Sequence, residues 1–173
     1  MSSNTENEKQ SISSTITTFD EMGLKDDLLR GIYSQGFEAP STIQQKGIIP
    51  VIRGDDSIVQ AQSGTGKTLT YIIAAYQRVD SRNKNCQILI IANTHELCSQ
   101  ILSVARGIST HMRDVYTCCC IGGKPISIDK NELRRGKQVV IGTPGRLYDL
   151  MQKNWCNTKH IKMLIMDEAD KLL

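Results

Sequence analysis

Residues 61–68 decide the fold, and they read Ala61-Gln62-Ser63-Gly64-Thr65-Gly66-Lys67-Thr68. A bound phosphate needs backbone N–H groups that approach it closely, and glycines permit that approach. Lys67 would place its cation on the β and γ phosphates, and the Thr68 hydroxyl would bind Mg²⁺. Ala61 stands where the strict form of this motif has glycine, and an ordinary glycine-rich turn is the simpler alternative. A predicted strand at 57–61 and a predicted helix at 67–79 favour a phosphate-binding loop between them.

Strand and helix patterns alternate along the chain on both sides of this loop. Apolar runs predict strands at 57–61, 87–92, 115–121, 138–142 and 162–166. Helical spacing predicts helices at 25–35, 67–79, 96–108 and 144–151, and a capping-box pattern from Ser41 to Gln44 begins another that runs toward Val51. This alternation is typical of an α/β fold with a mostly parallel sheet flanked by helices. Ligands in such folds bind outside the carboxyl ends of the strands.

Three acidic side chains follow the last predicted strand. Asp167, Glu168 and Asp170 come directly after the apolar run 163–166. A carboxylate at the end of a buried strand near a phosphate loop can hold Mg²⁺, and a second one can deprotonate a water. Alone, such a cluster is more typical of a solvated helix start. Together with the upstream loop it indicates a catalytic pair, Asp167 and Glu168.

Composition sets the broad class of protein. The chain has 173 residues, of which 39% are hydrophobic and 23% charged, a balance typical of one globular domain. No apolar run approaches the roughly 18 to 20 residues of a membrane-spanning helix, which excludes a transmembrane protein. The net charge of +3 neither requires nor excludes a nucleic-acid partner. Aromatic residues make up only 5%, so base stacking is not expected to dominate binding.

The beginning of the chain and its cysteines indicate the compartment. Residues 1–18 are mostly polar and lack the apolar stretch of a signal peptide, so we expect a flexible tail followed by one domain at 19–173. An intracellular location, cytoplasm or nucleus, is the default. The six cysteines then indicate reduced, buried thiols, and no C-x-x-C spacing favours zinc.

Two weaker motifs have simple structural alternatives. The segment Thr143-Pro144-Gly145-Arg146 could grip a nucleic-acid phosphate with its N–H groups and Arg146, but Thr before Pro is also common at a helix start. Gly122-Gly123 after a predicted strand is usually only a turn. Gln44, similarly, could merely complete the capping box.

Taken in order, these motifs resemble those of the DEAD-box RNA helicases from residue 19 to residue 173. Residues 36–44 resemble the family's Q motif, Phe19 resembles its upstream aromatic, and Ala61 is the family's usual residue at the start of the loop. The resemblance implies a RecA-like domain that binds ATP and Mg²⁺. Gln44 would hydrogen-bond the adenine edge and Phe19 would pack on its ring. Asp167 would hold Mg²⁺, and Glu168 would act on the attacking water.

The resemblance also implies an RNA partner. Residues that match the family's RNA-backbone motifs are Thr94, His95, Gly122, Gly123, Thr143, Pro144, Gly145 and Arg146. Within the family, residues 19–24, 28–33 and 43–45 resemble the eukaryotic initiation factor 4A group, which includes a translation factor and nuclear relatives in RNA processing. Partners of the initiation-factor type, and no membrane, are implied.

The family's Ser-Ala-Thr motif and its second RecA-like domain, which carries arginine fingers, do not occur among the 173 residues. An arginine finger contributes about 10³ to 10⁵ in rate. We therefore expect an incomplete domain with an unpaired sheet edge, weak nucleotide binding, very slow hydrolysis and no duplex unwinding. The alternative is a truncated module that binds RNA or a partner without turnover. An unrelated P-loop ATPase would leave the Q-motif match unexplained.

One position departs from the family pattern in a way that can be tested. The family has Pro-Thr-Arg-Glu-Leu-Ala where this chain has Asn93-Thr94-His95-Glu96-Leu97-Cys98. An imidazole that is mostly neutral cannot make the bidentate phosphate contact of a guanidinium. RNA affinity is therefore expected to be lower, and more dependent on pH, than with arginine.

We predict that His95→Arg raises the affinity for single-stranded RNA several-fold at pH 7.5 and steepens its salt dependence, because it adds a phosphate contact. Fluorescence anisotropy with a labelled oligonucleotide measures both effects. Unchanged affinity would show that position 95 does not contact the RNA backbone.

Overall fold

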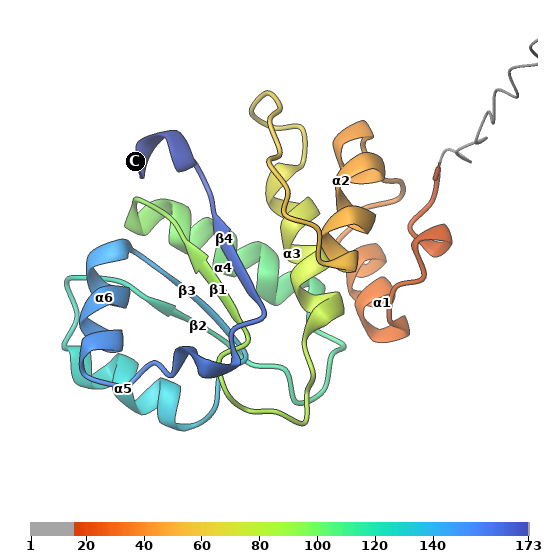
Figure 1. Ribbon diagram of the computed structural model, residues 1–173. Helices are drawn as coiled ribbons and strands as arrows, with labels where there is room; N and C mark the ends of the chain where they lie inside the picture. Colours follow the sequence, from red (N-terminus) through yellow and green to blue (C-terminus); the bar gives the residue numbers. More distant parts are fainter. Residues whose placement is uncertain (1–15, 173) are drawn as a thin grey trace, which may run out of the picture.

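A four-stranded parallel sheet forms the centre of the protein, in a computed structural model that describes residues 16–172 (Figure 1). The strands lie in the order β2-β3-β1-β4. Their bounds are β1 (Ile88–Ile91), β2 (Thr117–Cys120), β3 (Val139–Gly142) and β4 (Met163–Met166). Pairing aligns the last residue of each strand with the last residue of its neighbour, so all four carboxyl ends meet at one edge. The predicted α/β class is confirmed.

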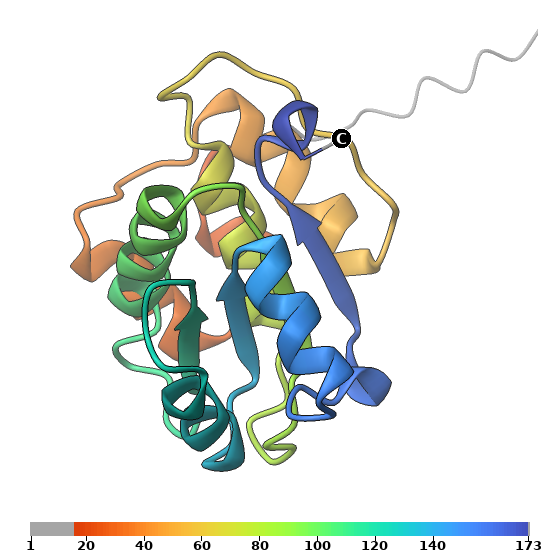
Figure 2. The ribbon, with the colours of Figure 1, turned by 90° about the vertical axis from the view of Figure 1, so that its left-hand side faces the viewer.

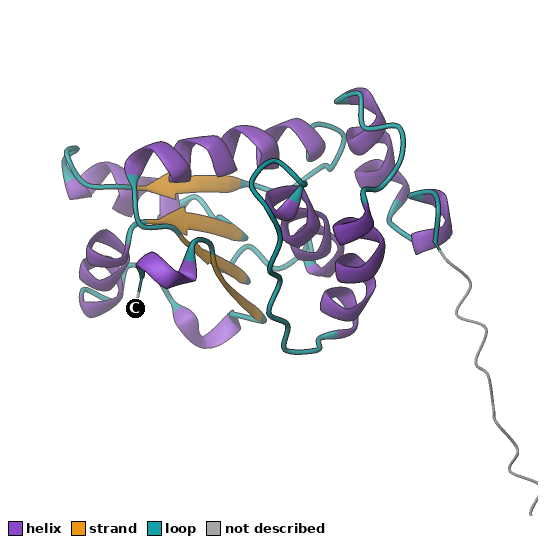
Figure 3. Cartoon of the chain, turned by 90° about the horizontal axis from the view of Figure 1, so that it is seen from above, coloured by secondary structure: helices purple, strands orange, loops and turns teal. Residues whose placement is uncertain are grey.

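Helices cover both faces of this sheet (Figures 1 and 3). Their bounds are α1 (Asp26–Ser34), α2 (Thr42–Arg53), α3 (Lys67–Arg78), α4 (His95–Ile108), α5 (Ile126–Arg134) and α6 (Pro144–Gln152). Helices α3 and α4 lie on one face, with α1 and α2 packed on their outer side, and α5 and α6 lie on the other face. Short 3₁₀ helices lie at Asp20–Met22, Thr158–His160 and Ala169–Lys171. No helix of residues 16–172 is long and apolar enough to cross a bilayer.

Two apolar clusters, one on each face of β1, pack the sheet against the helices on both sides. Ile88 and Ile90 belong to the larger cluster, which lies under α1, α3 and α4. Leu89 points the other way, toward the smaller cluster with Leu147 and Leu150 of α6. Alternation along a strand places neighbouring side chains on opposite faces. The near-continuous apolar run of this segment is thus explained by a two-sided burial, as predicted.

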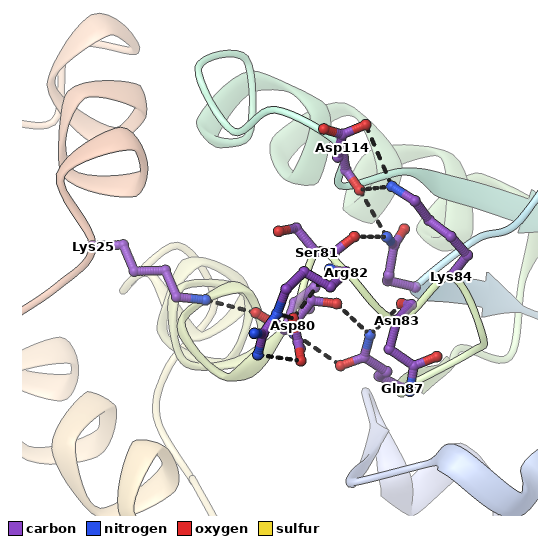
Figure 4. A network of polar contacts seen from close by, with 10 residues as sticks. Lys25, Asp80, Ser81, Arg82, Asn83, Lys84, Gln87 and Asp114 are labelled. Atoms are coloured by element: carbon purple, nitrogen blue, oxygen red, sulfur yellow. Dashed lines mark hydrogen bonds and ion pairs between the residues drawn. The ribbon is translucent and has the colours of Figure 1, made fainter.

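A buried polar side chain fixes the connection from α3 to β1 (Figure 4). Gln87 is fully buried, and its amide donates to the carbonyl oxygens of Asp80 and Asn83 at 2.8 and 2.7 Å. Its own oxygen accepts from the Asp80 N–H at 2.9 Å. On the α1 side, the Lys25 ammonium donates to the Val79 carbonyl at 2.7 Å. These bonds satisfy polar groups that would otherwise be costly to bury, and they fix the end of α3 against the start of β1.

The secondary structure differs from the sequence-based expectation in two places. Residues 57–61 form no strand, and Ile58 in the middle of this segment is fully exposed. An apolar segment becomes a strand only where a neighbouring strand supplies hydrogen bonds, and none of the described strands pairs with it. Helix α5 was not expected. Asp129 is its one buried residue, and only Ile126 and Leu133 pack, partly buried, against the smaller cluster, so its apolar stripe is short.

The sheet ends at β4, whose outer side pairs with no strand among the described residues, as expected for an unpaired edge. Leu164 and Met166 lie on the same face of the sheet as Leu89 and α6, and both are about half exposed. Of the expected tail at 1–18, residues 1–15 lie outside the described part of the chain.

Candidate functional site

The predicted phosphate loop leads directly into α3. Gly66 precedes the helix with a φ of +94°, a left-handed conformation that strains any side-chain-bearing residue. A Cβ atom at Gly66 would also lie 2.4 Å from the Gln44 side-chain nitrogen. The Lys67 ammonium donates to the carbonyl oxygens of Ala61 and, at 3.0 Å, of Gln62. Lys67 therefore bonds the loop itself, and its predicted phosphate contact would require it to leave these carbonyls.

The beginning of α2 is hydrogen-bonded to this loop. The Ser41 hydroxyl donates to the Thr65 carbonyl at 2.9 Å, and the Gln44 amide donates to the Gly66 carbonyl at 3.3 Å. Gln44 also accepts from the Ser41 N–H at 2.9 Å, which completes the predicted capping box. Both ends of the buried Gln44 amide are thus in use. Its predicted contact with adenine stays a prediction, and it would require one of these bonds to be exchanged.

Phe19 lies in the core rather than at the surface. Its side chain is fully buried and meets the Tyr33 ring edge-on, with 6.2 Å between centroids. A ring that packs on adenine needs an accessible face. The predicted adenine contact of Phe19 therefore requires its side chain to leave this position.

The predicted acidic pair lies at the carboxyl end of β4. The Asp167 N–H donates to the Ile91 carbonyl at 3.0 Å, which extends the pairing of β4 with β1. One oxygen of its carboxylate accepts from the Tyr71 hydroxyl at 2.8 Å, and the other accepts from the Glu168 N–H at 2.9 Å. The Tyr71 contact places Asp167 beside the first turn of α3, next to the phosphate loop.

Glu168 adopts a left-handed backbone conformation, with a φ of +49°. This conformation is uncommon for a residue other than glycine and is found most often at functional sites. Its exposed carboxylate pairs with Lys171 at 2.9 Å. The side chain is therefore free to reach a ligand outside the sheet edge once this surface ion pair, which is worth little, is broken.

Tyr71 is a site residue that sequence reasoning missed. Burial raises the pKa of its hydroxyl well above the ordinary range, the negative charge of Asp167 raises it further, and a hydrogen bond with Thr68 opposes the rise. The hydroxyl thus stays protonated and donates to Asp167, one of the predicted Mg²⁺ ligands. A hydroxyl and a carboxylate are hard oxygen donors, which suit Mg²⁺. The only signal in the sequence was its spacing, one helical turn after Lys67 and Thr68.

The residues of the predicted RNA motifs gather at the same edge of the sheet, where α4 and α6 begin (Figure 2). Thr94 caps α4 by accepting from the Leu97 N–H at 3.1 Å, and His95 follows it at the surface. A Cβ atom at Gly122 would lie 3.4 Å from the His95 ring nitrogen, so the loop after β2 touches the start of α4. The Thr143 N–H donates to the Cys120 carbonyl at 3.3 Å, which brings the segment from Thr143 to Arg146 beside β2.

Arg146 is held by the protein itself. Its guanidinium pairs with the carboxylate of Asp129 and donates to the Lys124 carbonyl at 2.7 Å, and its side chain is only 10% exposed. The bond to Lys124 fixes the loop that follows Gly123. A phosphate contact would have to compete with a buried ion pair, so the position favours a role in shaping the loop. Asp129 was missed because α5 was not expected.

This arrangement, a parallel sheet with a phosphate loop and an acidic pair at its carboxyl edge, defines a RecA-like P-loop domain. Residues 41–173 match the DEAD/DEAH box helicase family. The chain therefore belongs to this family, and its resemblance to the initiation factor 4A group, at the level of the N-terminal RecA-like domain, is confirmed.

The curated proteins that the chain resembles are ATP-dependent RNA helicases. The chain is 50% identical over 159 residues to "ATP-dependent RNA helicase eIF4A" of Pyricularia oryzae, covering 92% of this chain and 40% of that protein. The same protein of Phaeosphaeria nodorum is 52% identical with equal coverage. "ATP-dependent RNA helicase FAL1" of Yarrowia lipolytica is 50% identical over 156 residues, 90% of this chain and 39% of that protein. The chain thus spans about 40% of the length of these relatives.

A solved structure of Saccharomyces cerevisiae Dbp5, bound to RNA and ADP BeF3, superposes on 90% of this chain and 39% of its own. The TM-score is 0.76 at 31% identity. A second Dbp5 structure, bound to Gle1, gives a TM-score of 0.79 at 30% identity.

We predict that Tyr71→Phe, which removes only the hydroxyl, raises the Mg²⁺ concentration needed for nucleotide binding by about tenfold, because outer partners orient metal ligands. Titration of Mg²⁺ against a fluorescent ADP analogue measures this. Tyr116→Phe, at an exposed position, is the matched control and should leave the midpoint unchanged. An unchanged midpoint in Tyr71→Phe would mean that its hydroxyl does not position Asp167.

Proposed function

We propose that this chain is the ATP- and RNA-binding part of an RNA-dependent ATPase of the initiation factor 4A type. The observation that carries the proposal is the 2.8 Å bond from Tyr71 to Asp167, which brings the acidic end of β4 to the first turn of the helix behind the phosphate loop. A phosphate-binding loop and a carboxylate at this spacing are what phosphoryl transfer from ATP requires.

In this proposal the loop N–H groups and the amino end of α3 bind the phosphates, since a helix amino terminus attracts anions. Lys67 leaves the loop carbonyls and pairs with the β and γ phosphates. Thr68 and Asp167 hold Mg²⁺, which neutralises charge on the phosphate oxygens when bound. Glu168 orients the attacking water and accepts its proton. Gln44 and Phe19 would recognise adenine after the rearrangements described above.

RNA would lie across the edge where α4 and α6 begin. Thr94, His95, Gly123 and Gly145 are exposed there, and the first turns of α4 and α6 leave backbone N–H groups without partners inside the helix. Lys124 adds an exposed cation beside them. Contacts of this kind bind a sugar–phosphate backbone without reading its sequence. RNA and nucleotide in the Dbp5 structure support this assignment.

The alternative is a module that binds RNA or a protein partner without turnover. The chain spans about 40% of the length of its relatives, and the family's second RecA-like domain carries the arginine fingers. We propose that this second domain, or partners of the initiation-factor type, complete the catalytic site, in the cytoplasm or the nucleus and away from membranes. Dbp5, which contains a similar domain, is bound to the protein Gle1 in one structure.

We predict that Lys67→Ala weakens binding of a fluorescent ATP analogue at least about tenfold, because a phosphate group of the nucleotide loses its contact with the lysine cation.

Glu168→Gln should retain nucleotide binding and reduce RNA-stimulated hydrolysis by about 10² or more. Both are measured on the purified chain, by analogue fluorescence and by phosphate release.

Hydrolysis above the Glu168→Gln background supports the enzyme. RNA binding without any hydrolysis supports the module. If wild type and Lys67→Ala bind nucleotide equally, the assignment of the phosphate loop is refuted.

A further inference from the structure

Positive charge is concentrated in one part of the chain. Residues 113–162 contain ten of the 21 Lys and Arg residues but only four of the 18 Asp and Glu residues, so this segment has a net charge of +6 whereas the whole chain has +3. The segment includes β2, α5, β3 and α6. Because α5 and α6 cover the same face of the sheet, the excess of cations lies around these two helices and their loops.

A small polar cavity lies at the amino edge of the sheet, where the loops before β1 and β3 meet the loop after α6. Its lining includes two lysines, Lys84 and Lys137, two asparagines, Asn85 and Asn157, and Trp155. The volume of the cavity is about 90 Å³, whereas pockets for drug-sized molecules usually measure about 300 to 1,000 Å³. The cavity therefore has room for a single small group only. Ammonium groups and amide donors suit a phosphate group, which accepts charge-assisted hydrogen bonds.

The two lysines of this cavity lie against one aromatic ring. The Lys84 and Lys137 ammonium groups lie 5.3 and 5.6 Å from the centroid of the Tyr116 ring. Lys84 also pairs with Asp114 at 3.4 Å, as Figure 4 shows, and both side chains are exposed. An exposed ion pair of this kind is worth little, so a phosphate can replace the carboxylate of Asp114 at small cost. The Lys137 side chain is only 13% exposed and pairs with Glu132 at 2.9 Å, so we expect it to stay with this partner.

Two further cations gather at Trp155. The Lys130 and Lys153 ammonium groups lie 4.4 and 6.0 Å from the centroid of its ring. Within residues 16–172, no Asp or Glu side chain forms an ion pair with either lysine. Arg134, one helical turn after Lys130 on α5, is exposed. The charge of both lysines is thus not neutralised by the described acidic side chains, and it is available to an anion.

Helix α5 connects this cavity with the carboxyl edge of the sheet, where the predicted RNA motifs lie. It follows β2 and precedes β3, and because these strands are parallel it runs from the carboxyl edge to the amino edge. Its nine residues span about 14 Å. Lys124 is exposed just before the helix, Lys130 lies within it, and Arg134 ends it. A strand of RNA on the carboxyl edge would thus meet a line of cations that leads to the cavity.

We propose that this cavity and the lysines around it form a second RNA-binding surface. The cavity accepts one backbone phosphate through Lys84 and the asparagine amides, and Lys130 and Lys153 bind the adjacent phosphates. Such contacts bind RNA without reading its sequence. Because the surface lies at the edge opposite the phosphate loop, it binds RNA equally with and without nucleotide. The choice of RNA as the ligand rests on the proposed function and on the line of cations along α5, which an acidic protein would not need.

The first test is fluorescence anisotropy of a labelled oligouridylate with the purified chain, without nucleotide and over a range of salt concentrations. Lys84→Gln/Lys153→Gln removes two exposed cations of the surface and should weaken binding at least about fivefold. The slope of log affinity against log salt should fall by about 1.4, since each phosphate contact on a single strand contributes about 0.7. The matched control, Arg30→Gln/Lys46→Gln, removes the same charge from exposed positions on α1 and α2, and should change the affinity by less than about twofold.

A second test needs no variant. Ultraviolet cross-linking of the oligouridylate to the wild-type chain, followed by mass spectrometry, should attach nucleotides to the peptide that contains Trp155 as well as to peptides of the carboxyl edge. Cross-links at Trp155 alone would support this surface and contradict the RNA site of the proposed function.

Three results would overturn the proposal. Cross-links at the carboxyl edge alone, or equal affinity and salt slope in wild type and Lys84→Gln/Lys153→Gln, would refute the second surface and leave the proposed function standing. No RNA binding by the wild type would refute both. Labelled polyglutamate that binds as tightly as RNA, and loses affinity in the same variant, would assign the surface to acidic proteins instead.

Discussion

The pairing of β1 with both β3 and β4 determines where the candidate site residues that follow the strands lie. Because the register aligns Ile91 with Gly142 and with Met166, the residues that follow each strand emerge side by side. Asp167 follows β4, the RNA motif at Thr94 follows β1, and Thr143 follows β3. Segments far apart in the sequence thereby form one functional edge. A register shift of one residue would turn each of these side chains to the opposite face.

The phosphate loop is not held by this sheet. No described strand lies beneath it, and its support comes from α2, through Ser41 and Gln44, and from its own Lys67. The side chains that bond the free loop therefore include groups that are predicted to bind a nucleotide. In the proposed function, binding would exchange internal hydrogen bonds for bonds to phosphate and base, and the net gain in free energy would be smaller than the number of new contacts suggests.

Much of this could be predicted from the sequence, and the failures have physical causes. The apolar runs that became β1 to β4 are buried on at least one face, so their pattern reports their structure directly. Residues 57–61 have the same pattern but lack a pairing strand, which a local pattern cannot reveal. The contacts of Tyr71 with Asp167 and of Arg146 with Asp129 join residues 96 and 17 positions apart, and they depend on tertiary packing alone. The adenine contact of Phe19 stays a prediction, and the burial of its side chain was not foreseen.

The central claim is that the start of α2, the phosphate loop and the end of β4 respond to a nucleotide as one unit. Hydrogen–deuterium exchange of the chain with and without ADP and Mg²⁺ tests it most directly. The account predicts slower exchange together at residues 41–45, 62–70 and 165–168, because ligand and metal link these segments. Protection confined to one of them, or no change at saturating nucleotide, would contradict it.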